Sequence, residues 1–167
     1  ILNPGCRFFD KRIGQSTTLT GRTIVKHMSA EANKVITGVY DHVGDAMIYG
    51  DTDSCYFSAY PMLKDDIESG KIEWDTDKAI TLYDQISEAV DSTFIDMMAK
   101  SHHCPKSRAT VIAAGREIVA QSGLYITKKR YAALVVDNEG FRTDVDGKAG
   151  KVKAMGLDLR RSDTPVF

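Results

Sequence analysis

Helix-like and strand-like hydrophobic patterns occupy separate stretches of this sequence, and their order restricts the fold more than any other feature. Residues 16–37 and about 76–100 repeat apolar side chains at steps of three and four, which predicts two helices, the second capped by Asp75 or its neighbour. Residues 46–49 and 55–60 are β-prone runs separated by turn formers, which predicts a hairpin. Because there is no regular βαβ alternation, we expect an α+β fold, with helices packed on one face of a largely antiparallel sheet.

The last third of the chain has the composition of a sheet. Beyond residue 105, β-branched and aromatic residues gather in four runs, at residues 110–112, 116–119, 124–126 and 131–136. Gly115, Gly123 and the turn formers at 137–140 separate these runs. We therefore expect most of the strands to come from this part of the chain.

The overall charge is close to neutral and does not indicate a particular class of binding partner. The 167 residues carry 22 Lys+Arg against 23 Asp+Glu, so an acidic or basic partner must be recognised by local clusters. No apolar stretch approaches the ~18 to 20 residues of a membrane helix, and we expect neither a spanning nor a secreted chain. Three distant cysteines favour a reducing compartment. The start at Ile1 leads us to expect a piece of a longer protein.

Two carboxylates stand two residues apart in the predicted turn at residues 50–54, whose sequence is GDTDS. Asp51 and Asp53 would form a compact anionic site there, which suits a hard divalent cation such as Mg²⁺ that shares its remaining ligands with substrate phosphates. The alternative is a solvated hairpin turn, for which Asp and Gly are the usual residues. Composition alone leaves both interpretations open.

A basic run precedes the last long strand. Lys128, Lys129, Arg130 and Tyr131 place three cations beside an aromatic ring, a combination that can hold a phosphate backbone while the ring packs on a sugar or base. The alternative is a solvated strand edge, where lysines discourage edge pairing. The HHC run at residues 102–104 lacks a further metal ligand at a useful spacing, and we expect a surface loop there.

The GDTDS turn behind an apolar strand resembles the palm-domain signature of family B DNA polymerases. In the same order, the KKRYA segment at residues 128–132 resembles the strand that lies against the primer terminus, and residues 155–158 and 161–165 resemble the segment leading to the thumb. Residues 7–10 are similar to the segment after the fingers helix. The resemblance spans nearly the whole chain and is nearest to the replicative polymerases of large tailed bacteriophages.

The resemblance implies roles for particular residues. Asp53 would be the metal-binding carboxylate, with Asp51 as a neighbour that shapes the site and binds a metal through water. Lys129 would contact the last nucleotides of the primer, supported by Lys128, Arg130 and Tyr131. Glu117 would approach the metals from an adjoining strand. The cofactors implied are two Mg²⁺ ions, which Mn²⁺ can replace.

The resemblance also implies that this chain is incomplete. Residues 1–167 would form part of a palm domain, without the second aspartate-bearing strand, the fingers, the exonuclease or the thumb, and would be inactive alone. The parent would transfer a deoxynucleotide from a dNTP to a primer 3′-hydroxyl, with two cations about 3.5 to 4 Å apart stabilising the attacking and leaving oxygens. Its partners would be primer-template DNA, dNTP, the remaining polymerase domains and a sliding clamp. It would work in the cytoplasm of the host, away from membranes.

Two other functions remain as alternatives. A glycosyltransferase that holds a nucleotide-sugar diphosphate through Mn²⁺ or Mg²⁺ also places an acidic DxD at a strand end, but would have mostly parallel strands upstream. A non-catalytic nucleic-acid-binding α+β module would carry the acidic turn without using it. Measurement of Mn²⁺ or Mg²⁺ binding distinguishes this module from the polymerase and the glycosyltransferase.

Overall fold

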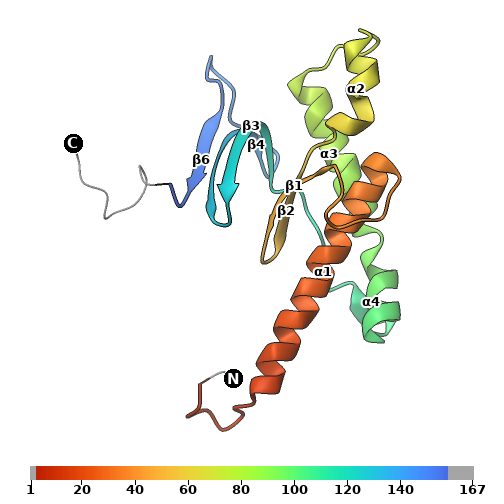
Figure 1. Cartoon of the computed structure of the whole chain (residues 1–167), viewed down its shortest axis with the longest axis vertical. Helices are drawn as coiled ribbons and strands as arrows, with labels where there is room; N and C mark the ends of the chain where they lie inside the picture. The colour runs from red at the N-terminus through yellow and green to blue at the C-terminus, as the bar shows by residue number, and fades with distance from the viewer. Residues whose placement is uncertain (1–2, 158–167) are drawn as a thin grey trace, which may run out of the picture.

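The computed structural model describes residues 3–157 as a helical body with two antiparallel sheets beside it (Figure 1). The elements are, in order, α1 (Lys11–Thr37), β1 (Met47–Asp51), β2 (Ser54–Phe57), α2 (Tyr60–Glu68), α3 (Thr76–Asp91), α4 (Phe94–His102), α5 (Lys106–Ala109), β3 (Ile118–Thr127), β4 (Arg130–Asn138), β5 (Phe141–Arg142) and β6 (Lys151–Met155). The predicted α+β class with antiparallel strands is confirmed. The segment at residues 161–165, on which part of the resemblance depends, lies outside the described residues.

Helix α1 begins five residues before its predicted start. The Asp10 side chain accepts a hydrogen bond from the Arg12 amide at 2.8 Å and caps the first turn, and Gly38, with φ of 82°, ends the helix in the left-handed conformation. Only the second half is packed, where Ala32 and Ile36 are buried. The first half projects away from the body (Figure 1).

The long helix predicted for residues 76–100 is two helices, α3 and α4. Asp75 caps α3 as predicted, accepting from the Lys78 amide at 2.8 Å. The break falls at Ser92 and Thr93, whose hydroxyls donate to carbonyl oxygens three residues back, each at 2.7 Å. These bonds satisfy two of the last carbonyl groups of α3. The chain can therefore turn at Ser92 and Thr93, although the apolar stripe of the sequence continues into α4.

The hydrophobic core lies between α1, α3, α4 and the first hairpin. Phe94 is 1% exposed and Ile86 2% exposed, and the small residues Ala32, Ala46 and Ala59 let these elements approach closely. This core fixes the position of β1 and β2 on the helices.

The strands form two sheets, where the sequence predicted one. β1 and β2 make a two-stranded sheet, and β3 to β6 make a four-stranded sheet in which β4 pairs with β3 on one side and with β5 and β6 on the other. All the pairings are antiparallel. The helices lie to one side of the four-stranded sheet (Figure 1).

Three local predictions in this region were wrong. Residues 110–112 are not a strand, because α5 starts after Pro105 and the chain leaves it in a turn that packs Ile112 against the helical core. Gly123 does not end a strand but pairs with Ala133 inside β3 and β4. The run predicted to extend to residue 60 stops at Phe57, because a proline near the start of α2 favours a first helical turn.

Candidate metal and nucleic-acid site

The predicted hairpin with the two carboxylates forms, with a tighter turn than expected. Asp51 ends β1 and pairs with Ser54, so only Thr52 and Asp53 lie in the turn, and Thr52 has a φ of 33°. The Thr52 hydroxyl donates to Asp51 Oδ1 at 3.0 Å, and the Ser54 hydroxyl donates to the Asp51 carbonyl oxygen at 3.3 Å. Asp51 is half-buried and Asp53 is exposed. The turn therefore presents the Asp53 carboxylate to solvent and holds that of Asp51 within its own hydrogen bonds.

A buried asparagine fixes the strand that carries this turn. Asn33, on α1, is 1% exposed, and its amide group donates to the Val39 carbonyl oxygen at 2.8 Å. Its side-chain oxygen accepts from the Ala46 amide at 3.1 Å, one residue before β1. Gly44 lies so close that a Cβ there would be 2.2 Å from Asn33 Nδ2. The helix thus sets where β1 begins.

The basic run forms the turn between β3 and β4. Thr127 pairs with Arg130, which leaves Lys128 and Lys129 in the turn, and Lys129 has a φ of 61°. Lys128, Lys129 and Arg130 are exposed, whereas Tyr131 is 3% exposed. The strand therefore begins at Arg130 rather than at Lys128. Tyr131 points into the protein, and the exposed cations are accessible to a partner of opposite charge.

The turn between β1 and β2 (residues 51–54, the acidic turn) and the turn between β3 and β4 (residues 127–130, the basic turn) meet, although they lie far apart in the sequence. The Lys129 amide donates to the Tyr49 hydroxyl at 2.8 Å, across 80 residues of chain. The same hydroxyl is 3.5 Å from Asp51 Oδ2, a long contact that it makes as donor. The structure thus brings Asp51 and Lys129, two of the predicted site residues, to the two sides of one tyrosine.

Sequence reasoning missed the cluster of four tyrosines that joins the hairpins. Tyr49 and Tyr56 face each other across β1 and β2, and Tyr125 and Tyr131 face each other across β3 and β4. The four rings pack together with centroids 5.4 to 5.7 Å apart. The Tyr56 and Tyr131 hydroxyls are 3.0 Å apart. The available signal was one tyrosine on each side of the predicted acidic turn and one on each side of the basic run.

Burial changes the acidity of these phenols. It is the main reason why the pKa of Tyr56 lies well above its usual value, and the hydrogen bond with Tyr131 raises it further. Burial likewise raises the pKa of Tyr125. Both phenols stay neutral at physiological pH, and Tyr56 shares its hydrogen bond with Tyr131 without adding charge to the site.

An open groove of about 840 Å³ runs from the acidic turn along β3 and the helical body. Asp53 and Glu117 both line it, together with Tyr56, Tyr125 and Trp74. Glu117 also pairs with Lys153 of β6, whose Nζ is 2.5 Å from its Oε1. The predicted approach of Glu117 to a metal is thus compatible with the groove, but its visible partner is a lysine.

The two carboxylates of the turn fit part of a magnesium site. Mg²⁺ is commonly held by one or two carboxylates, with waters and substrate phosphates completing its shell. Among residues 3–157, no group of three or more His, Cys, Asp or Glu side chains converges on one point. Asp51 and Asp53 could therefore hold a cation only together with ligands from a substrate or from another segment.

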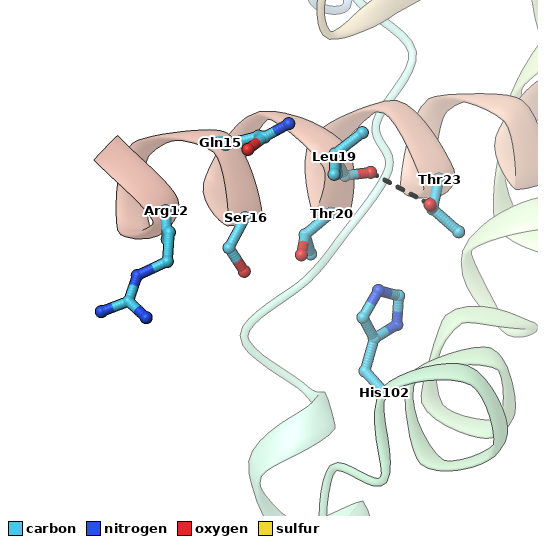
Figure 2. Close-up of a pocket in the computed structure, with 7 residues that line it drawn as sticks. All are labelled: Arg12, Gln15, Ser16, Leu19, Thr20, Thr23 and His102. Carbon is cyan, nitrogen blue, oxygen red and sulfur yellow. Dashed lines mark hydrogen bonds between the residues drawn. The ribbon is translucent and has the colours of Figure 1, made fainter. Parts of the chain in front are cut away.

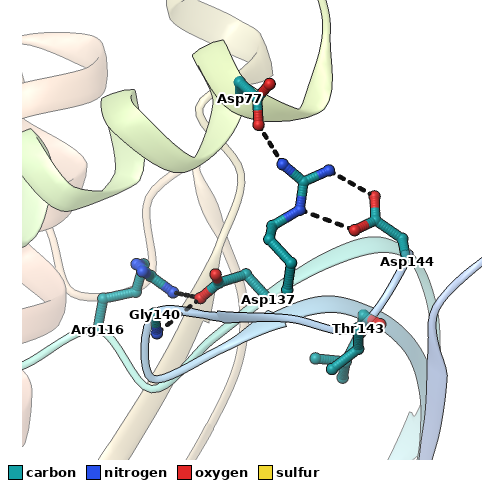
Figure 3. A network of polar contacts seen from close by, with 8 residues as sticks. Asp77, Arg116, Asp137, Gly140, Thr143 and Asp144 are labelled. Atoms are coloured by element: carbon teal, nitrogen blue, oxygen red, sulfur yellow. Dashed lines mark hydrogen bonds and ion pairs between the residues drawn. The ribbon is translucent and has the colours of Figure 1, made fainter. Parts of the chain in front are cut away.

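Two arginines tie the four-stranded sheet to α3 (Figure 3). Arg116 pairs with Asp84 of α3. It also pairs, at 2.5 Å, with the buried Asp137 of β4, as Figure 3 shows. Arg142 pairs with Asp77 of α3 and, at 2.7 Å, with Asp144. Burial opposes the charge on Arg116, but its two carboxylates outweigh burial and raise its pKa. These bridges help to place β3 and β4, and with them the basic turn, relative to the helices.

A second hollow, of about 310 Å³, lies between the projecting half of α1 and the end of α4 (Figure 2). It is lined by Arg12, Thr20 and Thr23 among other α1 residues and by His102 from α4. His102 ends α4 and His103 caps it with φ of 51°, so the predicted surface loop begins one residue later than expected. Within the described part of the chain, His102 Nδ1 has no hydrogen-bond partner.

Comparison with known proteins finds a DNA polymerase. No known protein-family model matches the chain. The chain is 29% identical, over 95% of its length, to the DNA-directed DNA polymerase of Escherichia phage RB69, and it spans 18% of the length of that protein. This similarity supports a relationship to phage DNA polymerases. No helix among residues 3–157 is long and apolar enough to cross a membrane.

Proposed function

We propose that this chain is part of the palm domain of a family B DNA polymerase, which extends a DNA primer by transferring a deoxynucleotide from dNTP to the primer 3′-hydroxyl. The observation that carries the proposal is that the Tyr49 hydroxyl contacts both Asp51, beside the acidic turn, and the Lys129 amide in the basic turn. The similarity to a phage DNA polymerase over nearly the whole chain supports it independently.

The proposed roles follow from charge and exposure. Asp53, exposed at the tip of the turn, is the carboxylate best placed to bind Mg²⁺ or Mn²⁺, and Asp51, at the end of β1, would shape the site beside it. Divalent cations, when bound, would neutralise the triphosphate and increase the acidity of the primer hydroxyl. Lys128, Lys129 and Arg130 would hold the primer backbone near its end. Further ligands would come from the remaining domains of the parent, which would also bind template and a sliding clamp.

Replacing Asp53 in the complete polymerase tests the metal role. Asp53→Asn keeps the side-chain volume but removes the charge, so we expect primer extension to fall by about 100-fold or more, with primer-template affinity nearly unchanged. Asp45→Asn is the matched control, since Asp45 is an exposed aspartate in the loop before β1. Primer extension, DNA affinity and Mn²⁺ affinity are measured for both variants.

The result separates the alternatives. Loss of DNA affinity in step with activity would argue against a metal role for Asp53. Equal Mn²⁺ binding by wild type and Asp53→Asn would favour a non-catalytic nucleic-acid-binding module. The glycosyltransferase alternative predicted mostly parallel strands, whereas every strand pairing among the described residues is antiparallel.

A further inference from the structure

The two halves of the proposed site belong to different sheets and are joined through side chains. The hairpin β1–β2 pairs only with itself in the described part of the chain, and β3 and β4 belong to the other sheet. Within residues 3–157, hydrogen bonds run between the two sheets from the Lys129 amide to the Tyr49 hydroxyl and between the Tyr56 and Tyr131 hydroxyls. The distance between the two turns therefore depends on the tyrosines and not on a shared backbone ladder.

Tyr49 differs from the other three tyrosines because its hydroxyl touches both turns. It accepts the Lys129 N–H at 2.8 Å, which leaves its own proton free to point towards Asp51 Oδ2, 3.5 Å away. The Tyr49 ring is stacked on Tyr125, with an angle of 27° between their planes, so the hydroxyl is held at the end of a packed ring. The Tyr49 hydroxyl thus joins the backbone of the basic turn, through a hydrogen bond, to the Asp51 carboxylate, through a longer polar contact.

The basic turn is held from its other side by a glycine. Lys129 has a φ of 61°, the left-handed conformation that a residue with a side chain adopts uncommonly. Gly156, after β6, lies so close that a Cβ there would be 2.0 Å from the Lys129 carbonyl oxygen. The Lys129 peptide is therefore fixed at its N–H by Tyr49 and packed at its carbonyl against Gly156.

We propose that Tyr49 is a positioning residue, whose hydroxyl sets the basic turn relative to the acidic turn so that a primer end held by the first is presented to the carboxylates of the second. This inference rests on the proposed polymerase function. Tyr49 itself touches neither primer nor metal in this arrangement. It acts through the Lys129 backbone and through Asp51.

The test compares two Tyr→Phe variants in the complete polymerase. Tyr49→Phe keeps the stacked ring and removes the hydroxyl that reaches both turns. Tyr125→Phe is the matched control, because it lies in the same cluster and the described residues offer its hydroxyl no hydrogen bond. We expect Tyr49→Phe to slow single-nucleotide incorporation about tenfold, which corresponds to one hydrogen bond, with primer-template affinity changed less than about twofold. Tyr125→Phe should change both by less than about twofold.

A second readout is independent of activity. Hydrogen–deuterium exchange of the Lys129 amide should be about tenfold faster in Tyr49→Phe than in wild type, and unchanged in Tyr125→Phe, because only the first variant frees this N–H. A general loss of packing would instead increase exchange throughout both hairpins. That pattern would overturn the positioning role.

The remaining outcomes are equally decisive. If both Tyr→Phe variants slow incorporation equally, or if Tyr49→Phe loses DNA affinity in step with rate, the inference fails while the proposed function stands. If Asp53→Asn extends primers normally, the proposed function fails whatever Tyr49→Phe does. Slow incorporation, intact DNA affinity and faster exchange at Lys129 in Tyr49→Phe alone would support the inference.

Discussion

The helical body and the four-stranded sheet are stabilised by different means. In the body, large apolar side chains such as Phe94 and Ile86 are almost completely buried between helices. In the sheet, Leu124 and Ile126 of β3 are 61% and 59% exposed, and burial is concentrated on β4. The four-stranded sheet is joined to α3 through ion pairs of arginines and to the first hairpin through tyrosine side chains. The strength of such polar interactions depends on the direction and the distance between the groups.

This difference matters because the two turns of the candidate site belong to differently stabilised parts of the molecule. The acidic turn is carried by a hairpin packed on the apolar core, and the basic turn by the sheet. Contacts between apolar side chains tolerate small displacements of the elements that carry them, whereas hydrogen bonds and ion pairs require particular distances and directions between their groups. The body thus contributes most of the stability, and the polar junction sets the relation between the turns.

The largest expected effect is on the core of the body. Phe94→Ala should lower the free energy of unfolding by about 4 kcal/mol, because it leaves a cavity where the side chain is 1% exposed. Leu124→Ala on β3 should cost less than about 1 kcal/mol, since that side chain is mostly exposed. Urea unfolding of both variants measures the difference. Similar losses would show that body and sheet do not differ in this way.

An intermediate effect is expected at the arginine bridges. Arg116→Ala should cost about 3 kcal/mol, because it leaves the buried carboxylate of Asp137 without its cation. Arg142→Ala should cost less than Arg116→Ala, since the Arg142 side chain is itself one third exposed and one of its two partners, Asp77, is largely exposed. Urea unfolding distinguishes them.

A double variant shows whether the buried charge is the cause. Replacing both partners, as Arg116→Met with Asp137→Leu, should recover much of the stability lost by Arg116→Ala. If the double variant is no more stable than Arg116→Ala, the loss comes from packing rather than from an unpaired carboxylate.

The smallest effect is a pH dependence that belongs to the body. His27 lies against Phe94, with its ring nitrogens 2.9 Å from the Tyr40 and Thr93 hydroxyls, and burial lowers its pKa despite the opposing charge of Glu31. As the pH falls below about 6.5, the unfolded chain takes up this proton first, so stability declines. His27→Gln should flatten this slope between about pH 7.5 and about pH 5.5 in urea unfolding. An unchanged slope would assign the titration to another group.

Local patterns predicted those elements whose cause is local. Helix α1, the hairpin at the acidic turn and the start of α3 at Asp75 follow from periodicity, turn formers and capping. The break at Ser92 and Thr93 was missed because the apolar stripe runs through it and the side-chain bonds that end α3 leave no mark in the periodicity. The division into two sheets was missed because strand partners depend on long-range contacts.

In the candidate site, too, the residues could be predicted from local sequence, whereas their arrangement in space could not. The residue types and spacing were sufficient to nominate Asp51, Asp53 and Lys129, and their metal and DNA roles stay predictions. The acidic turn was predicted as a turn, whereas the basic run was predicted to open a strand and is the turn between β3 and β4. That the turns meet, and that Tyr49 lies between them, depends on rings from two sheets packing together. No pattern within either segment contains that information.

The tyrosine cluster gives the junction an optical signature of its own. Four phenol rings held rigidly within 6 Å of one another should contribute to near-ultraviolet circular dichroism, and that signal disappears when fixed packing is lost. The single tryptophan, Trp74, stands just before α3 and lines the groove that Tyr56 and Tyr125 also line. The near-ultraviolet signal of the rings therefore follows the junction between the two sheets in solution, whereas far-ultraviolet circular dichroism follows melting of the helices.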